Sequence, residues 1–274
     1  MPAASRPTAP IVAVEGLSGS GKSTVSRRFA RARRALWIPE AYRRLGPAAS
    51  LDFRNPRELL ALEQRLLRED AARFVEARRI AATGREVVVD TGFAGTLTYS
   101  HALARLGLAP RSVARRLGAE ARRRWGRSGW GVPDLVVWIE TSASTRAARI
   151  AGDPTGHPPA WAARHEAVGR IERALYLGPI ARRYGARFVT VSGEGSPEAV
   201  ARRIVRARAR APPGPIGAEL AGDLLGWLAF EEPAPRPGPG RTAARNRRRA
   251  DRAAPRASAA RPGRRSTGGR AGQA

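Results

Sequence analysis

The sequence predicts an α/β domain in which a parallel sheet is covered by helices on both faces. Two observations carry this prediction. Short, continuous apolar runs alternate along the chain with longer segments of helical periodicity, a pattern typical of parallel strands buried on both faces. In addition, the first apolar run leads into a glycine-rich turn and then a helix, with the sequence GLSGSGKST at residues 16–24. A strand, a glycine-rich turn and a helix in this order are typical of α/β domains, so this segment predicts the same fold class.

The first half of the domain follows this alternation. Asn55 and Pro56 supply an N-cap followed by a proline at the first helical position, and Gly84 ends the long helix that they open. The expected elements are strand 11–14, helix 25–34, strand 35–38 ending at Pro39 and Glu40, a helix from 56 to about 83, and strand 87–89 ending on Asp90.

The second half continues in the same way, and Ser196 and Pro197 repeat the signature of a cap followed by proline. A stretch rich in Gly and Pro at 152–159 is expected to be a loop. The expected elements are helices 94–106 and 111–124, strand 135–139, helix 144–150, helix 160–184, strand 187–191 and a last helix to about 210.

Composition divides the chain into four parts. Residues 1–10 are expected to be disordered, and 11–211 form the α/β domain. Residues 212–230 hold a linker and a short helix whose stripe of Leu220, Leu224, Trp227 and Leu228 predicts docking on the domain. Residues 231–274 are nearly all Arg, Ala, Pro and Gly, cannot bury a core and are expected to be disordered.

Charge and cysteine content limit the class of protein. The chain has no cysteine, and no segment approaches the roughly 18 apolar residues of a membrane span, so we expect a cytoplasmic protein without a membrane partner. The net charge of +27 divides into +20 for residues 1–210 and +7 for 211–274. Such an excess suits polyanionic ligands, either nucleotides or nucleic acid, and predicts weak electrostatic nucleic-acid binding by the tail. The sequence also leaves a homodimer open.

The lysine content singles out the glycine-rich turn. Among 50 basic residues the chain has a single lysine, Lys22, and it stands in a full match to G-x-x-x-x-G-K-[ST]. An arginine's planar fork cannot replace a compact ammonium that backbone wraps around a phosphate. Backbone N–H groups of the turn and the positive helix end favour phosphate oxygens. We therefore expect ATP to bind residues Gly16, Leu17, Ser18, Gly19, Ser20, Gly21, Lys22, Ser23 and Thr24, and Ser23 to ligate Mg²⁺.

Acidic residues stand directly after the predicted strands. Glu40 follows the second strand, Asp90 ends the third and Glu140 follows the fourth. Ligands of open parallel sheets lie beyond the carboxyl ends of the strands. Asp90 is therefore expected to hold Mg²⁺ together with Ser23, and Glu40 to accept a hydroxyl proton or bind an acceptor.

These pieces resemble the nucleoside and nucleotide kinase group of P-loop proteins, thymidylate kinase most closely, over about residues 11–207. The resemblance rests on Glu15 before the loop, on residues 84–90, on the spacing to Leu97 and Tyr99, and on residues 133–140. It implies a three-layer sandwich with a five-stranded sheet of order 2-3-1-4-5, ATP and Mg²⁺ as cosubstrates, and a mobile lid. Arginines flank the expected lid loop, and one of them is expected to stabilise charge on the transferred phosphoryl: Arg146, Arg149, Arg164 and Arg170.

One departure from the thymidylate kinase pattern affects the choice of acceptor. Thymidylate kinases follow the third-strand aspartate with an arginine that grips the acceptor's phosphate, and this chain has Thr91 there. Either the acceptor is not thymidylate, or another arginine holds its phosphate, with Arg43, Arg68 and Arg73 as candidates. Tyr99 is expected beside the acceptor base.

The sequence thus predicts a phosphotransferase that moves the γ-phosphoryl of ATP to a nucleoside or nucleoside monophosphate. Catalysis is assigned to Lys22, Asp90, Glu40 and the lid arginines Arg146 and Arg149. Two alternatives stay open. The basic surface also suits a kinase acting on nucleic-acid 5′ ends, and Thr91 also suits a nucleotide-binding regulatory protein without transfer chemistry.

Overall fold

The computed structural model describes residues 8–45, 55–92, 94–125, 132–152 and 159–212. The Ala9 N–H donates to the Ala81 carbonyl at 3.0 Å, so the backbone just before residue 11, the expected start of the domain, is already bonded to it. The docking helix and the tail expected from the sequence lie outside the described residues. Within the described helices, none has the length and apolar character needed to cross a bilayer.

Five parallel strands form one sheet with the order β2-β3-β1-β4-β5. This is the order that the resemblance to nucleotide kinases implied, and it confirms the predicted fold class. Because β3 and β4 both pair with β1, Val14 lies beside Asp90 on one side and Val137 on the other. The strands are β1 (Ile11–Gly16), β2 (Leu36–Ile38), β3 (Val87–Asp90), β4 (Leu135–Glu140) and β5 (Phe188–Ser192).

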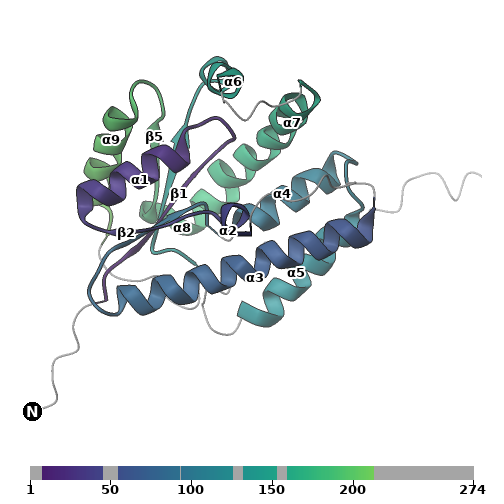
Figure 1. Ribbon diagram of the computed structural model, residues 1–274, viewed down its shortest axis with the longest axis horizontal. Coiled ribbons are helices and arrows are strands. Elements are labelled where there is room, and N and C mark those ends of the chain that lie inside the picture. Colours follow the sequence, from purple (N-terminus) through teal and green to yellow (C-terminus); the bar gives the residue numbers. More distant parts are fainter. Residues whose placement is uncertain (1–7, 46–54, 93, 126–131, 153–158, 213–274) are drawn as a thin grey trace, which may run out of the picture. The chain divides into compact units, whose positions relative to one another are not determined.

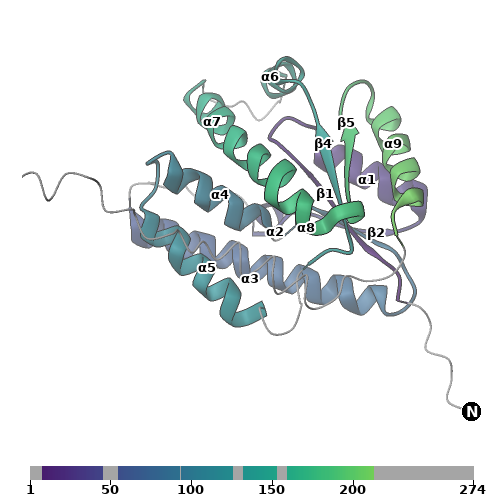
Figure 2. The ribbon, with the colours of Figure 1, turned by 180° about the vertical axis from the view of Figure 1, so that it is seen from behind.

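Helices cover both faces of the sheet (Figures 1 and 2). Val12 and Val14 pack with α1 and α9 on one face, whereas Ile11 packs with the larger helical layer on the other. This alternation explains why the strands are apolar throughout. The helices are α1 (Lys22–Arg33), α2 (Ala41–Leu45), α3 (Pro56–Ala81), α4 (Ala94–Arg105), α5 (Arg111–Trp125), α6 (Ala143–Ala151), α7 (Pro159–Leu175), α8 (Ala181–Tyr184) and α9 (Pro197–Arg210).

Both predicted N-caps are confirmed. The Asn55 side chain accepts from the Arg57 N–H at 3.1 Å at the start of α3, and Ser196 accepts from Ala199 at 3.2 Å at the start of α9. The short helix α2 was not predicted, because five residues carry too little periodicity to be recognised. Helix α1 begins at Lys22, three residues earlier than the expected start at 25.

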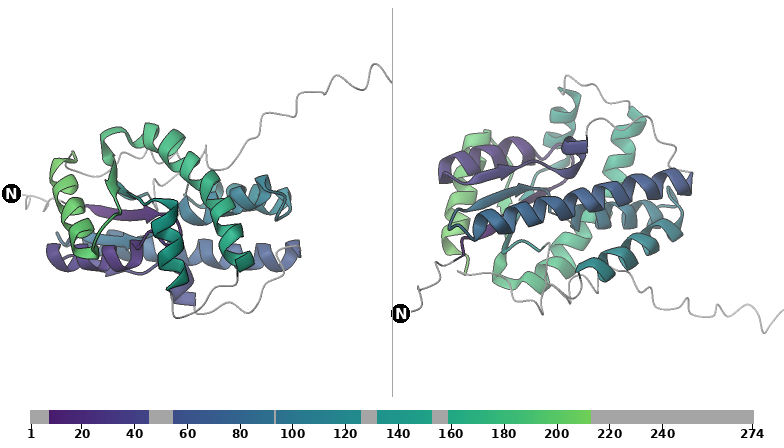
Figure 3. Two further views of the ribbon diagram at one scale, coloured as in Figure 1. Left: turned by 90° about the horizontal axis from the view of Figure 1, so that it is seen from above. Right: turned by 60° about the horizontal axis from the view of Figure 1, so that its bottom comes forward.

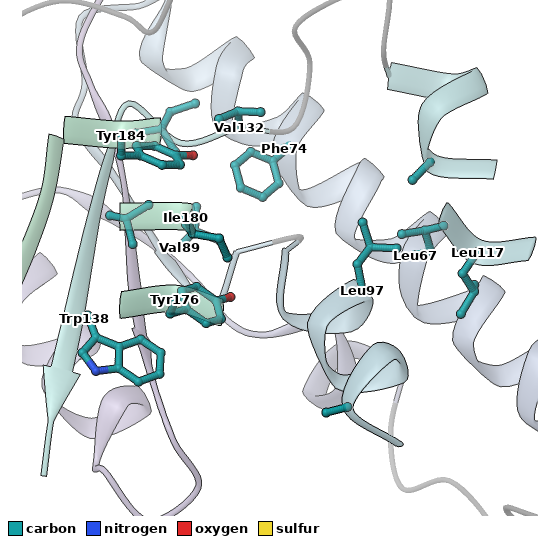
Figure 4. Packing of buried hydrophobic residues seen from close by; sticks show 14 of the residues in the cluster. Leu67, Phe74, Val89, Leu97, Leu117, Val132, Trp138, Tyr176, Ile180 and Tyr184 are labelled. Atoms are coloured by element: carbon teal, nitrogen blue, oxygen red, sulfur yellow. The ribbon is translucent and has the colours of Figure 1, made fainter. Parts of the chain in front are cut away.

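The helix expected over 160–184 is interrupted by a π-helical segment at Tyr176–Ile180, between α7 and α8. Pro179 lies inside this segment, and its missing N–H and its ring oppose regular α-helical hydrogen bonding. The segment places the Tyr176 ring in a stacked contact with Trp138 of β4, with ring centroids 4.8 Å apart. Figure 4 shows Tyr176, Ile180 and Tyr184 following one another along this part of the core. Figure 3 shows the same helices against the sheet from two further sides.

Candidate nucleotide site

The predicted phosphate-binding turn joins β1 to α1. The Ser20 N–H donates to the Leu17 carbonyl at 3.0 Å, so the turn folds back on itself before the helix. Helix α1 has Gly21 as its N-cap and no side chain caps it. The first N–H groups of a helix need partners, and an anion is a suitable one. The turn therefore has the geometry of a phosphate site.

Two glycines make this turn possible. Gly19 and Gly21 have φ of 77° and 84°, in the left-handed region that residues with a Cβ seldom adopt. A Cβ on Gly19 would also lie 2.8 Å from the Arg146 carbonyl of α6. Both the conformation and the close approach explain the glycines that the sequence motif requires.

Asp90 lies at the end of β3 and is fully buried. Burial raises the pKa of its carboxyl, while the Lys22 ammonium and the Ser23 hydroxyl act in the opposite direction and favour the ionised form. Neither oxygen has a regular hydrogen-bond partner within the described residues. A buried carboxylate left without donors, next to a serine hydroxyl, suits the oxygen ligands that Mg²⁺ prefers. Asp90 and Ser23, which the sequence predicted as metal ligands, thus fit the ion.

Further acids surround Lys22 that the sequence did not mark as site residues. Burial raises the pKa of Glu15 on β1 to about 8, although the Gly92 N–H and Lys22 lower it. Burial likewise raises the pKa of Glu172 on α7 to about 7, again against the charge of Lys22. Glu15 was visible as an acid inside an otherwise apolar strand. Glu172 gives no such signal, because it stands in a helix with many charged residues.

Arg146 and Arg149 both lie on α6, where the expected lid begins, and both guanidinium groups have protein partners. Arg149 donates to the Ser20 carbonyl at 2.8 Å and the Gly193 carbonyl at 3.0 Å, and so ties the phosphate turn to the loop after β5. Arg146 donates to the Thr141 carbonyl at 2.9 Å and pairs with Glu166. Residues 153–158 of the expected lid lie outside the described part.

The residues expected at the acceptor do not share one environment. Glu40 accepts from Arg43 Nε at 3.2 Å, and its charge raises the pKa of Asp90, so Glu40 belongs to the same site. Arg68 is exposed on α3. Tyr99 is half-buried on α4 with its ring 6.0 Å from the His165 ring, and burial raises its pKa.

Arg73 is fully buried on α3 and joins that helix to the end of β3. Its Nη1 donates to Asp70 at 2.5 Å, and its Nη2 donates to the carbonyls of Asp90 at 2.6 Å and Thr91 at 3.0 Å. These contacts satisfy both terminal nitrogens of the guanidinium. Arg73 therefore holds the backbone at Asp90 and Thr91.

Replacing Arg73 by leucine is expected to lower the free energy of unfolding by about 3–5 kcal/mol, because Asp70 is left as a buried charge without its cation. Chemical denaturation measures the change. Arg79→Leu, an exposed arginine on the same helix, is the matched control and should change stability by less than about 0.5 kcal/mol. Equal effects of the two substitutions would show that the buried pair does not stabilise the fold.

Comparisons with known proteins agree with this geometry. The AAA domain family model matches residues 11–127, from β1 through α5. Deoxyadenosine kinase from M. mycoides, solved with bound dATP, superposes with a TM-score of 0.56 at 14% identity, covering 73% of this chain and 99% of that one. Thymidylate kinase from Candida albicans gives 0.54 at 12% identity, covering 76% and 97%. No curated protein sequence matches the chain.

The overall fold is that of these two solved enzymes. The resemblance to thymidylate kinase drawn from the sequence is therefore confirmed at the level of the fold. The chain thus has the fold of the nucleoside and nucleotide kinases, with a turn that matches the P-loop motif at residues 16–23.

Proposed function

We propose that the protein is a kinase that transfers the γ-phosphoryl of ATP to a hydroxyl of a small, nucleoside-type acceptor that carries no phosphate. One observation carries the proposal. The carboxyl ends of β1 and β3 lie side by side, so the sole lysine acts on the buried carboxyl of Asp90, whose oxygens have no regular hydrogen-bond partner in the described part of the chain. Phosphoryl transfer needs a phosphate cradle and a metal-binding acid at one point.

Each residue of this site is assigned a separate role. The backbone of the turn and the Lys22 ammonium bind the phosphates, and Arg149 keeps the turn in place through Ser20. Ser23 and Asp90 would hold Mg²⁺, which when bound neutralises charge on the phosphate oxygens. Glu40 lies near Asp90 and accepts the proton of the attacking hydroxyl. Catalysis in this scheme is positioning and charge stabilisation.

The charges around the acceptor side support an acceptor without phosphate. Arg73 is engaged by Asp70 and by backbone, Arg43 pairs with Glu40, and Arg68 is exposed on α3. Among the three arginines considered for this role, none is left buried and ready for an anion. Glu15 and Glu172 add carboxyl groups next to Lys22. These carboxyl groups offer a second phosphate no positive charge.

A transfer assay with γ-labelled ATP tests the proposal. Nucleosides, nucleoside monophosphates, small alcohols and 5′-hydroxyl oligonucleotides serve as acceptors, with Lys22→Ala as the blank. We expect labelled nucleoside monophosphates as the main products. Transfer to oligonucleotides alone would support the nucleic-acid 5′-kinase instead. Tight ATP binding without transfer to any acceptor would support the regulatory protein.

The tail is proposed to bind polyanions only through its charge. Deleting residues 231–274 removes 12 Arg and 3 acidic residues, a change of −9 in net charge. Kinetics on small acceptors and the melting temperature should stay nearly unchanged, because the segment has too few apolar residues to build a core. Binding to single-stranded DNA should weaken and depend less steeply on salt. Unchanged DNA affinity across a salt series would exclude the tail as the binding site.

A further inference from the structure

Thr91, directly after β3, has a backbone conformation that its residue type disfavours. Its φ is 61°, and within the described residues only Arg34 shares a positive φ among residues other than glycine. A β-branched side chain is particularly unfavourable in the left-handed region, where glycine or asparagine is usual. Strained residues of this kind persist only where the surrounding structure holds them, and they concentrate at functional sites.

The surroundings hold Thr91 on three sides. Its N–H donates to the Val14 carbonyl at 3.0 Å, and its carbonyl accepts from Arg73 at 3.0 Å. The following N–H, of Gly92, donates to Glu15 Oε1 at 2.6 Å. A Cβ on Gly92 would lie 2.8 Å from the same oxygen, so the contact needs glycine. Strand β1, helix α3 and a buried acid together impose the strained conformation.

The side chain of Thr91 is also fixed. A Cβ on Gly95, in the first turn of α4, would lie 2.6 Å from the Thr91 methyl group, so the methyl packs against that turn. The hydroxyl is buried, and within the described residues it has no hydrogen-bond partner. A buried hydroxyl without a partner is unfavourable, and so is the backbone. The fold thus retains two unfavourable features at one residue beside Asp90.

We propose that the Thr91 hydroxyl binds the acceptor and determines its specificity, by a hydrogen bond to a hydroxyl group of an acceptor without phosphate. This inference rests on the proposed function and names the group that distinguishes one acceptor from another. A threonine hydroxyl pairs with a neutral alcohol either as donor or as acceptor. An anion at this position would find no free guanidinium in Arg73, because that side chain already binds Asp70 and the carbonyls of Asp90 and Thr91. The position therefore favours a hydroxyl over a phosphate.

Three variants of the full chain test the assignment. Thr91→Val keeps the shape and the branching at Cβ and removes only the hydroxyl, whereas Thr91→Ser keeps the hydroxyl. Thr141→Val is the matched control, because the Thr141 hydroxyl is likewise buried and has no partner among the described residues, but Thr141 follows β4, on the other side of β1. The measurements are melting temperature, Kd for ATP, and kcat/KM for the best nucleoside found in the transfer assay.

We expect Thr91→Val to lower kcat/KM for the nucleoside by roughly 10- to 100-fold. Its melting temperature should be unchanged or higher, because an unpaired buried hydroxyl is lost, and its Kd for ATP should stay the same. Thr91→Ser should retain kcat/KM within about threefold, and Thr141→Val should leave it unchanged.

Two results would overturn the assignment while leaving the kinase in place. One is an active wild-type protein whose Thr91→Val variant keeps its kcat/KM for the nucleoside. The other is an equal loss in Thr91→Val and Thr141→Val, which would mean that removing any buried hydroxyl disturbs the site. A wild-type protein that transfers phosphoryl to no acceptor is a different result, because it overturns the proposed function itself.

Discussion

Replacing Lys22 by alanine is expected to lower phosphoryl transfer by at least about a thousandfold while leaving the fold intact. The ammonium lies half-exposed at the start of α1, and no other lysine exists in the chain to replace it. Its charge acts on Glu15, Asp90 and Glu172, all of which burial already shifts toward the neutral form. Losing the cation therefore removes a phosphate contact, while the buried acids can respond by keeping their protons, so the fold should be retained. Initial rates with γ-labelled ATP and a thermal melt measure the two effects.

Two substitutions make this result specific to the ammonium. Lys22→Arg keeps the charge but replaces a compact group by a planar fork, and should also lose most of the activity. Arg31→Ala removes an exposed cation from the same helix and should change the rate less than about twofold. Wild-type activity in Lys22→Ala would end the kinase hypothesis.

Asp90→Asn is the second substitution with a large expected effect. It should lower the Mg²⁺-dependent rate by about a hundredfold or more, because a neutral amide binds the ion more weakly than a carboxylate does. ATP binding measured in EDTA should change little, since without the metal the lost charge has no partner on the nucleotide. Titrating Mg²⁺ in the transfer assay should show a weaker apparent affinity for the ion.

The control for this substitution is Glu198→Gln, which neutralises an exposed carboxylate paired with Arg28 of α1. It should leave the Mg²⁺ titration unchanged. If Asp90→Asn weakened ATP binding with and without Mg²⁺ to the same degree, Asp90 would be a structural residue.

The phosphate turn and the strands could be predicted from the sequence because each is formed by residues that are close together in the chain. Gly19, Gly21 and Lys22 stand within one short motif, and each strand is a single apolar run. The strand order came from the resemblance and not from periodicity. The placement of Asp90 beside the turn followed from its position at the end of a strand.

Other features depend on contacts between distant parts of the chain and were not predicted. Arg73 was considered as a phosphate ligand, but its partners include Asp90 and Thr91, which belong to another element. Arg149 donates to the carbonyl of Gly193, which lies in the loop after β5. Thr91 was recognised only as a departure from a family pattern. Its left-handed backbone comes from the surrounding strand, helix and acid, none of which the local sequence encodes.

Two buried acids, one beside Lys22 and one on α3, also make folding a proton-binding reaction. The pKa of Glu15 rises from the usual 4.5 to about 8, and that of Glu63 on α3 to about 7, in both cases mainly through burial. At a pH between the usual pKa and the raised pKa of each acid, the folded protein keeps a proton that the unfolded chain releases. The free energy of unfolding should then fall as the pH rises from about 4.5 toward 8, as far as these groups determine it. The folded protein should thus be less stable in mildly alkaline than in mildly acidic solution. The net charge of +27 alone would give the opposite trend, because a higher pH reduces the repulsion between positive charges.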